Sequence, residues 1–187
     1  MSLSPAENER ELLHTRTVTC HGYGRADGLW DIEGRVVDQK AYAFDNHDRG
    51  RVEVGDPLHD MALRLTLDDN LTIKAVEAVT DKSPYSICPT ITPNFQRLVG
   101  LTIAPGFTRR ARRLLGGIEG CTHLLELLGP IGTTAFQTIM PALERKRSGG
   151  RKRSAGDRPA LLSTCHAYAP DSPVVKRLWP EIAERQQ

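Results

Sequence analysis

The fold is decided by one stretch near the middle of the chain, Met61-Ala62-Leu63-Arg64-Leu65-Thr66-Leu67, followed by Asp68-Asp69-Asn70 and then Leu71-Thr72-Ile73-Lys74-Ala75. Apolar and polar residues alternate in both runs, which is the period of a strand with one buried face. The polar residues between the runs are typical of a turn. Residues 58–80 therefore predict an antiparallel hairpin with one face in the core.

The segments before this hairpin also have strand character. Residues 13–20 are rich in β-branched side chains, which favour a strand. The Asp27-Gly28 pair that follows is a favoured hairpin turn, because both positions tolerate a positive φ. Apolar residues between 29 and 44 break only around Gly34, which predicts one long bent strand or two short ones. Residues 45–56 have the composition of a polar loop.

Helices are expected in the second half of the chain. Residues 118–140 carry apolar residues at helical spacing, interrupted at Gly129-Pro130, and so predict a kinked helix or two helices in tandem. Residues 161–183 form a packed tail anchored by Trp179. Strands followed by helices indicate the α+β class, with an antiparallel β-sheet covered on one face by helices and a single domain over 1–187.

Composition sets limits on the kind of protein this is. The chain has 187 residues, 39% hydrophobic and 26% charged, which fits one globular domain. No apolar run reaches the length of a membrane span, and residues 1–12 do not have the pattern of an export signal. Its four cysteines are widely spaced, so neither a disulfide framework nor a zinc ribbon is supported. We therefore expect a cytoplasmic protein that does not contact a membrane.

Positive charge is concentrated in one segment. The formal net charge is +2, but six Lys and Arg residues lie between Arg145 and Arg153, so the rest of the chain is mildly acidic. Residues 145–158 are also rich in glycine, which predicts a basic flexible loop. Because this segment lacks aromatic residues, we expect no specific nucleic-acid binding.

Three short segments carry the residue types of acid–base or metal chemistry: His59-Asp60, Cys88 and Cys121-Thr122-His123. Imidazole titrates near physiological pH, and a helix N-terminus lowers the pKa of a thiol. Each residue also has a structural interpretation, since histidines and cysteines are often buried without a role in function. We predict that His59, Asp60 and His123 line one cavity between the sheet and the long helix, with Cys88 close by.

Other polar residues are candidates for binding a substrate: Arg25, Trp30, Arg64, Cys88, Cys121 and Gln137. Their structural alternative is a solvated hairpin in which Trp30 caps the sheet. The chain has no glycine-rich phosphate loop, no paired Rossmann glycines, no nucleophile elbow and no His-Glu-x-x-His motif. Phosphoryl transfer, dinucleotide redox chemistry and serine hydrolysis by familiar motifs are therefore unsupported.

Three segments together carry a family resemblance: residues 25–34 (Arg-x-Asp-Gly-Leu-Trp-Asp-Ile-Glu-Gly), Leu58-His59-Asp60-Met61, and residues 120–129 with their Gly-Cys-Thr-His-Leu start. In these segments the chain resembles the bacterial domain of unknown function 2889 family. The resemblance covers nearly the whole chain, and it implies a context of aromatic and acyl compound catabolism.

A fainter resemblance is to the scaffold proteins of iron–sulfur cluster assembly. In those proteins an Asp, a Cys and a second Cys follow one another as Asp60, Cys88 and Cys121 do here. The first scaffold cysteine, expected just before the aspartate, is replaced by Leu58-His59. The resemblance therefore implies a related fold with a repurposed site.

These observations lead to a first hypothesis, a small lyase without a cofactor that acts on an aromatic, lignin-type metabolite. His59 or His123 would be the base that removes a hydroxyl proton as an aldehyde is released, Asp60 would orient the base, and Arg64 or Arg25 would stabilise the phenolate. The expected partner is a small aromatic substrate, and a homo-oligomer is left open.

Two hypotheses from other classes remain. The first is a metal- or iron–sulfur-cluster-binding accessory protein that uses Asp60, Cys88, Cys121 and His123, with zinc or iron as the cofactor. The second is a non-catalytic interaction module that uses the basic loop. Metal content separates the first of these from the lyase hypothesis.

Overall fold

The computed structural model describes residues 4–148 and 161–184. The chain divides into two compact units, Met1–Leu143 and Glu144–Gln187. The first unit holds the sheets and the helices that cover them, so it carries the predicted α+β fold. Among the described residues, no helix combines the length and the apolar character needed to cross a membrane.

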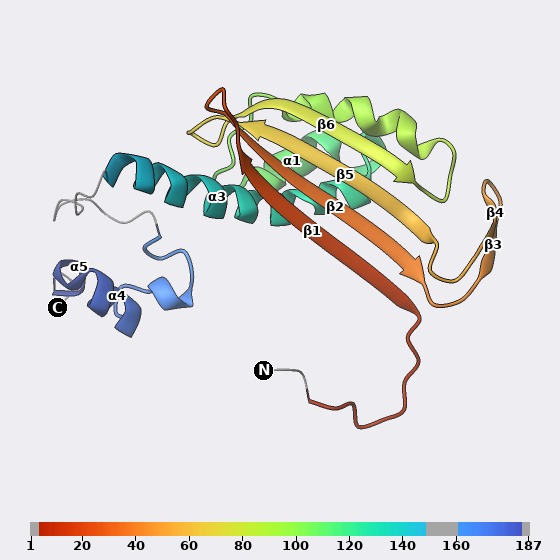
Figure 1. The fold of residues 1–187 in the computed structure, drawn as a ribbon, viewed down its shortest axis with the longest axis horizontal. Helices are drawn as coiled ribbons and strands as arrows, with labels where there is room; N and C mark the ends of the chain where they lie inside the picture. Colours follow the sequence, from red (N-terminus) through yellow and green to blue (C-terminus); the bar gives the residue numbers. More distant parts are fainter. Residues whose placement is uncertain (1–3, 149–160, 185–187) are drawn as a thin grey trace. The chain divides into compact units, whose positions relative to one another are not determined.

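The main sheet has four antiparallel strands in the order β1-β2-β5-β6 (Figure 1). The strands are β1 (His14–Gly24), β2 (Trp30–Lys40), β5 (Pro57–Leu67) and β6 (Ile73–Lys82). Two short strands, β3 (Phe44–Asn46) and β4 (Gly50–Val52), form a separate hairpin beyond the end of β2. Consecutive strands of the main sheet are therefore neighbours, and β1 and β6 are its edges.

The predicted hairpin over residues 58–80 is confirmed as β5 and β6. Every second side chain of β5 from Met61 to Leu67 is apolar and at most 1% exposed. The turn is held by Asp68, whose carboxylate accepts hydrogen bonds from the backbone amides of Asn70 and Thr72, both at 2.9 Å. This is the side-chain capping that favours aspartate in turns.

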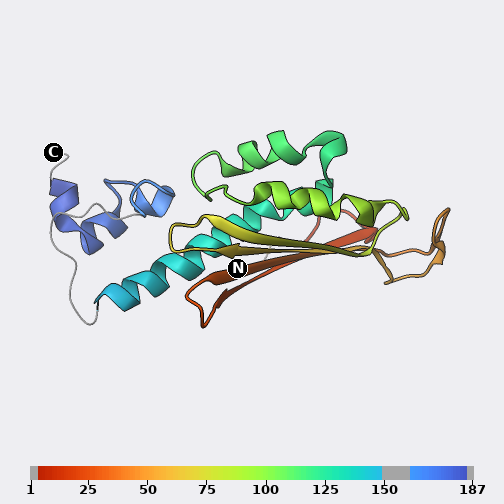
Figure 2. The same cartoon turned by 90° about the horizontal axis from the view of Figure 1, so that it is seen from above.

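Within the described part of the first unit, the helices lie on one face of the sheet, as predicted, and Figure 2 shows η1 and α1 on that side. These elements are η1 (Cys88–Leu98), α1 (Phe107–Leu115), η2 (Gly117–Glu119), α2 (Thr122–Glu126) and α3 (Leu128–Ser148). Their apolar residues form one buried cluster with those of the strands. A Cβ at Gly34 would lie 2.8 Å from the side chain of Ile131 in α3, so glycine allows this helix to lie close to β2.

Several boundaries differ from the sequence predictions. Residues 30–40 form one continuous strand, and the predicted polar loop at 45–56 contains most of the β3–β4 hairpin. The helical region is two helices in tandem, but they separate at Leu127, and Gly129-Pro130 lies in the first turn of α3. A proline is tolerated there because the first amides of a helix have no intrahelical acceptor.

The predicted basic loop at 145–158 is helical as far as Ser148, because α3 continues from its apolar residues into the basic segment and ends at Ser148. Residues 149–158 lie outside the described residues. In the second unit, α4 (Pro173–Leu178) and α5 (Pro180–Glu184) follow the short η3 (His166–Tyr168). Trp179 packs on Tyr168 with ring centroids 5.8 Å apart.

Candidate active site

The candidate site lies on the helix-covered face, where three residues from neighbouring strands form a row across the sheet. Arg16 of β1 is paired with Asp38 of β2, and Asp38 is paired with His59 of β5. Strand alternation places these side chains on the same face as Val36 and Met61, which belong to the core. The strand register therefore brings an arginine, a carboxylate and an imidazole together.

The strands are irregular at this row. The pairing of β2 with β5 shifts between Asp38 and Gln39, and that of β5 with β6 shifts between Asp60 and Met61. Such bulges change the direction of side chains and are frequent next to active sites. The first irregularity adjoins Asp38, the pairing partner of His59, and the second adjoins Asp60, the residue that follows His59.

Asp38 is the centre of the site, with a side chain that is only 1% exposed. Arg16 donates to both carboxylate oxygens through Nε and Nη2, each at 2.8 Å. His14 Nε2 lies 3.0 Å from Oδ1, and His59 Nδ1 lies 3.0 Å from Oδ2. A buried carboxylate is stable only when it is paired in this way.

These contacts keep Asp38 ionised. Burial by itself would raise the pKa of its carboxyl, but the hydrogen bonds and charge of Arg16, with contributions from His59 and His14, outweigh burial and lower the pKa to about 2. At neutral pH the carboxylate can therefore only accept hydrogen bonds.

The helical layer contributes a second imidazole. His123 lies near the start of α2, and its ring stacks on that of His59, with centroids 3.7 Å apart and planes tilted by 31°. His123 Nε2 is 3.8 Å from Asp38 Oδ2, which is an electrostatic contact and too long for a hydrogen bond. Glu126, also on α2, pairs with Arg16 and so connects this helix to β1.

Both imidazoles favour the neutral state. The pKa of His59 is lowered by burial and by the nearby His123, against the opposing effect of Asp38. The pKa of His123 is lowered by burial and by the charge of Arg16. Their side chains are 12% and 25% exposed, respectively, so both rings are largely but not completely buried.

Cys121 adjoins the histidine pair. Its Sγ is 3.7 Å from the sulfur of Met61 and 3.9 Å from Nδ1 of His123. These are weak contacts that position a half-buried thiol beside the second imidazole. All four cysteines of the chain are free thiols.

Three of these residues also have the geometry of a metal site. Asp38, His59 and His123 each offer a ligand atom, and these atoms lie within 4.8 Å of one another. Two imidazoles and a carboxylate suit zinc or iron(II). However, Arg16 already donates to both oxygens of Asp38, so a bound cation would lie close to a guanidinium and share its counter-charge.

The predicted grouping of His59, Asp60 and His123 needs one correction, because Asp60 lies on the other face of the sheet. Adjacent residues of a strand point to opposite faces, so His59 and Asp60 cannot share a site on one face. Asp60 instead accepts from Arg35 at 2.7 and 2.5 Å. Asp38 is the carboxylate that faces the histidines.

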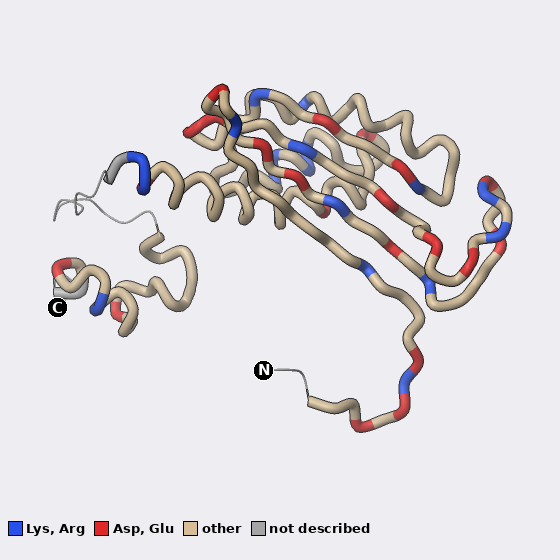
Figure 3. The backbone as a smooth tube through the Cα atoms, viewed as in Figure 1, with Lys and Arg blue, Asp and Glu red and all other residues tan. Residues whose placement is uncertain are grey.

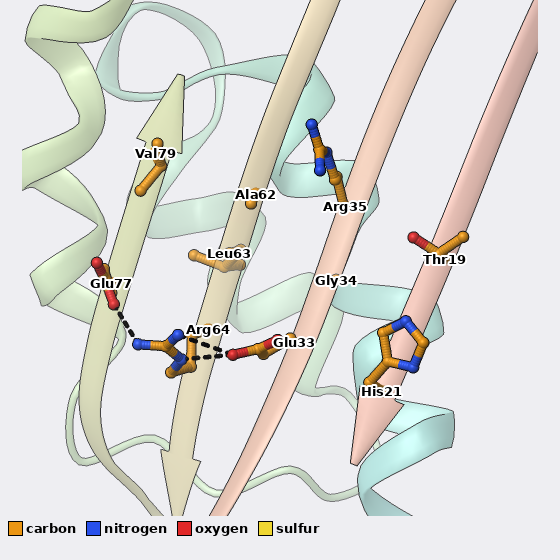
Figure 4. Close-up of a pocket in the computed structure, with 10 residues that line it drawn as sticks. All are labelled: Thr19, His21, Glu33, Gly34, Arg35, Ala62, Leu63, Arg64, Glu77 and Val79. Atoms are coloured by element: carbon orange, nitrogen blue, oxygen red, sulfur yellow. Dashed lines mark hydrogen bonds and ion pairs between the residues drawn. The ribbon is translucent and has the colours of Figure 1, made fainter. Parts of the chain in front are cut away.

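Charged residues of both signs lie on neighbouring strands of the sheet (Figure 3), and several of them form a network on the uncovered face. Arg64 donates to Glu33 at 2.8 Å and to Glu77 at 2.5 Å. These residues border a shallow hollow of about 340 Å³ that also includes Thr19 and His21 (Figure 4). Arg64 therefore lies on the face opposite to His59.

The remaining predicted binding residues are dispersed. Arg25 pairs with Asp27 and Asp31 near the first hairpin turn. Trp30 is 5% exposed in the core at the other end of β2, and Gln137 is exposed on α3. Cys88 begins η1, and it is not part of the Asp38 group. Of the predicted binding residues, only Cys121 adjoins the histidines.

Asp38, His14 and Arg16 were missed by the sequence predictions. A signal for Asp38 exists in the alternation Ile32-x-Gly34-x-Val36-x-Asp38, which places a carboxylate on an apolar strand face. His14 and Arg16 share a face of β1 by the same alternation. Their pairing with Asp38 depends on the strand register, which sequence spacing alone does not determine.

Comparison with known proteins gives a family but no activity. A family described as "Protein of unknown function (DUF2889)" matches residues 14–137. This span includes His14, Arg16, Asp38, His59 and His123. No curated protein and no solved structure matches the chain. The chain therefore belongs to the DUF2889 family of proteins of unknown function.

Proposed function

We propose that this protein is a small lyase without a cofactor, in which His59 acts as a general base oriented by Asp38. The observation that carries the proposal is the 3.0 Å contact between His59 Nδ1 and the buried Asp38 carboxylate. A histidine held in this way by a carboxylate is a recurring arrangement in acid–base catalysis.

The hydrogen bond determines which nitrogen can accept a proton. Because the ionised Asp38 can only accept, Nδ1 of His59 must carry the hydrogen. The lowered pKa of His59 keeps the ring neutral at pH 7. The lone pair is then on Nε2, which is the atom available to remove a proton from a substrate.

The proposed reaction releases an aldehyde from a hydroxymethyl side chain on a phenolic compound in its quinone methide form. His59 Nε2 takes the hydroxyl proton, and the carbon–oxygen double bond of the aldehyde forms as the carbon–carbon bond breaks. The electron pair of that bond enters the conjugated ring and ends on the phenolate oxygen. The proton that His59 has taken up is then passed to this oxygen, directly or through water, and the ring returns to its neutral state. The atoms and charges balance without an oxidant, a reductant or a metal.

The proposed substrate class follows from the sequence. An aromatic, lignin-type metabolite is suggested by the family resemblance in the sequence. The proposal places the enzyme in the cytoplasm, where four free thiols would remain reduced.

A metal-binding function is the alternative, and it is favoured by the spacing of Asp38, His59 and His123. Arg16 argues against it, because a guanidinium beside the carboxylate raises the free energy of a bound cation. Metal analysis of the purified protein separates the two functions. Stoichiometric zinc or iron that is lost in Asp38→Asn would favour the metal-binding function and contradict the lyase.

The lyase is tested by measuring aldehyde released from phenolic compounds with hydroxymethyl side chains. His59→Gln should lower turnover by about 10² to 10⁴, the range typical of a positioned proton-transfer group. His47→Gln is a matched control, because the His47 side chain is 98% exposed and, within the described residues, its polar contact is with Asp48. Equal turnover in both variants would contradict the assignment of His59, and no aldehyde from any compound in the series would contradict the reaction.

A further inference from the structure

The surface arginines of the first unit fall into two groups. Most have a carboxylate partner on a neighbouring element. The paired residues include Arg25, Arg35, Arg51, Arg64 and Arg97. Three arginines on α1 have no such partner among the described residues. A cluster of this kind calls for an explanation, because unpaired like charges lower the stability of a helix.

Three arginines of α1 have exposed side chains without a partner: Arg109, Arg112 and Arg113. None of them forms an ion pair or side-chain hydrogen bond with any residue that the structure describes. They occupy positions i, i+3 and i+4, so their guanidinium groups share one side of the helix. We call these residues the α1 arginine cluster.

The helix that carries the cluster is firmly held. Phe107, Ala111 and Leu115 on its other side are at most 4% exposed. Arg110 is held differently from the three arginines of the cluster, because it donates to the carbonyls of Thr102 at 2.9 Å and Pro105 at 3.2 Å. The three guanidinium groups therefore project from a backbone that is fixed by packing, which lowers the entropic cost of binding a ligand.

The cluster surrounds a space of limited size. A shallow hollow of about 440 Å³ is lined by Thr108 and the three arginines. The first turn of α1 contains no acidic residue. With nine residues the helix is about 13 Å long, which is short for an extended polyanion such as a nucleic-acid strand.

The surroundings of the cluster also favour a compact ligand. Residues 1–143 contain fifteen Lys and Arg residues against eighteen Asp and Glu residues, so this unit is acidic apart from α1. This excess of negative charge outside α1 disfavours a long polyanion or an anionic membrane, because either would extend beyond the helix. A small ligand with concentrated negative charge would contact the arginines alone.

We propose that the α1 arginine cluster binds a compact anion with two or more phosphate groups, such as a pyrophosphate moiety. The planar guanidinium donates two parallel hydrogen bonds to phosphate oxygens, which makes arginine suited to this ligand. Thr108 supplies a hydroxyl donor at the edge of the hollow. The site is on a different element from His59 and does not depend on the proposed lyase.

The test is calorimetric titration of the full chain with inorganic pyrophosphate, at low and at physiological salt. The double variant Arg112→Gln with Arg113→Gln should weaken binding at least about tenfold, because each lost pair removes charge-assisted hydrogen bonds. Arg51→Gln is the control, since Arg51 is exposed and pairs with Asp45 and Glu53. The affinity of this control variant for pyrophosphate should stay within about twofold of that of the unmodified chain.

Three outcomes would overturn the proposal. One is the absence of saturable pyrophosphate binding, and another is equal affinity in the double variant and the original chain. The third is tighter binding of a duplex oligonucleotide or of phosphatidylserine vesicles than of pyrophosphate, with the same loss in the double variant. Thermal unfolding of each variant checks that the chain is folded. Because Phe107 and Leu115 remain buried, we expect each variant to keep its fold.

Discussion

Replacing Asp38 with Asn should cost about 2 kcal/mol of the free energy of unfolding at pH 7, and the cost should fall with pH. The pKa of Asp38 is about 2 in the folded protein, against 3.8 for an unperturbed carboxyl. Each pKa unit corresponds to about 1.4 kcal/mol. The side chain is only 1% exposed, so solvent screens little of this interaction. Because the folded pKa is the lower one, the stabilisation is complete above the unfolded pKa and is lost as pH falls from 3.8 towards 2.

Urea unfolding followed by circular dichroism, at pH 7 and at pH 3, measures this cost directly. At pH 3, between the two pKa values, about half of it should remain. Asp45→Asn is the control, because the Asp45 side chain is 84% exposed and its pair with Arg51 should contribute less than about 0.5 kcal/mol. A cost for Asp38→Asn that equals the control, or that is the same at both pH values, would refute the assignment of Asp38 as a buried, paired carboxylate.

Three further predictions concern the strands, the thiols and the histidine. Gly34→Ala should lower the free energy of unfolding by about 1 to 3 kcal/mol in the same urea assay, because the new Cβ would lie 2.8 Å from the buried Ile131. With iodoacetamide at pH 8, Cys20 should react more slowly than the exposed Cys165, since burial raises the pKa of the Cys20 thiol. The lowered pKa of His59 predicts that stability rises with pH through the range just below 6.5, and that His59→Gln makes this rise smaller.

Local patterns were sufficient to predict much of the fold. The apolar residues of β5 alternate from Met61 to Leu67 and a polar turn follows, so the β5–β6 hairpin could be predicted from the sequence, although the buried face of β6 shifts between Ile73 and Val76. Gly28 adopts the positive φ expected of the Asp27-Gly28 turn, with a value of 85°. By contrast, Gly34 interrupts the apolar pattern of β2 although the strand continues through it. The position is a glycine because the side chain of Ile131 fills the space that a Cβ would occupy.

The site was predicted only in part, for reasons of geometry. His59 and His123 could be selected by residue type, and their rings do meet. Asp60 was selected because a carboxylate directly before an apolar strand must be paired, solvated or used, but it faces away from His59, since neighbours along a strand point to opposite faces. Asp38 is 21 residues from His59 in sequence, and only the register of β2 on β5 brings them together.

The central claim is that Asp38 holds the His59 ring with its hydrogen on Nδ1 and a free lone pair on Nε2. Nitrogen–proton correlation spectra of the histidine side chains, recorded between pH 5 and pH 8 and assigned with His59→Gln, test it most directly. We predict the Nδ1–H tautomer of His59 at pH 7 and a pKa below 6.5. In Asp38→Asn the preference for this tautomer should be reduced. An Nε2–H tautomer, or a pKa above 6.5 in the unmodified chain, would contradict the account.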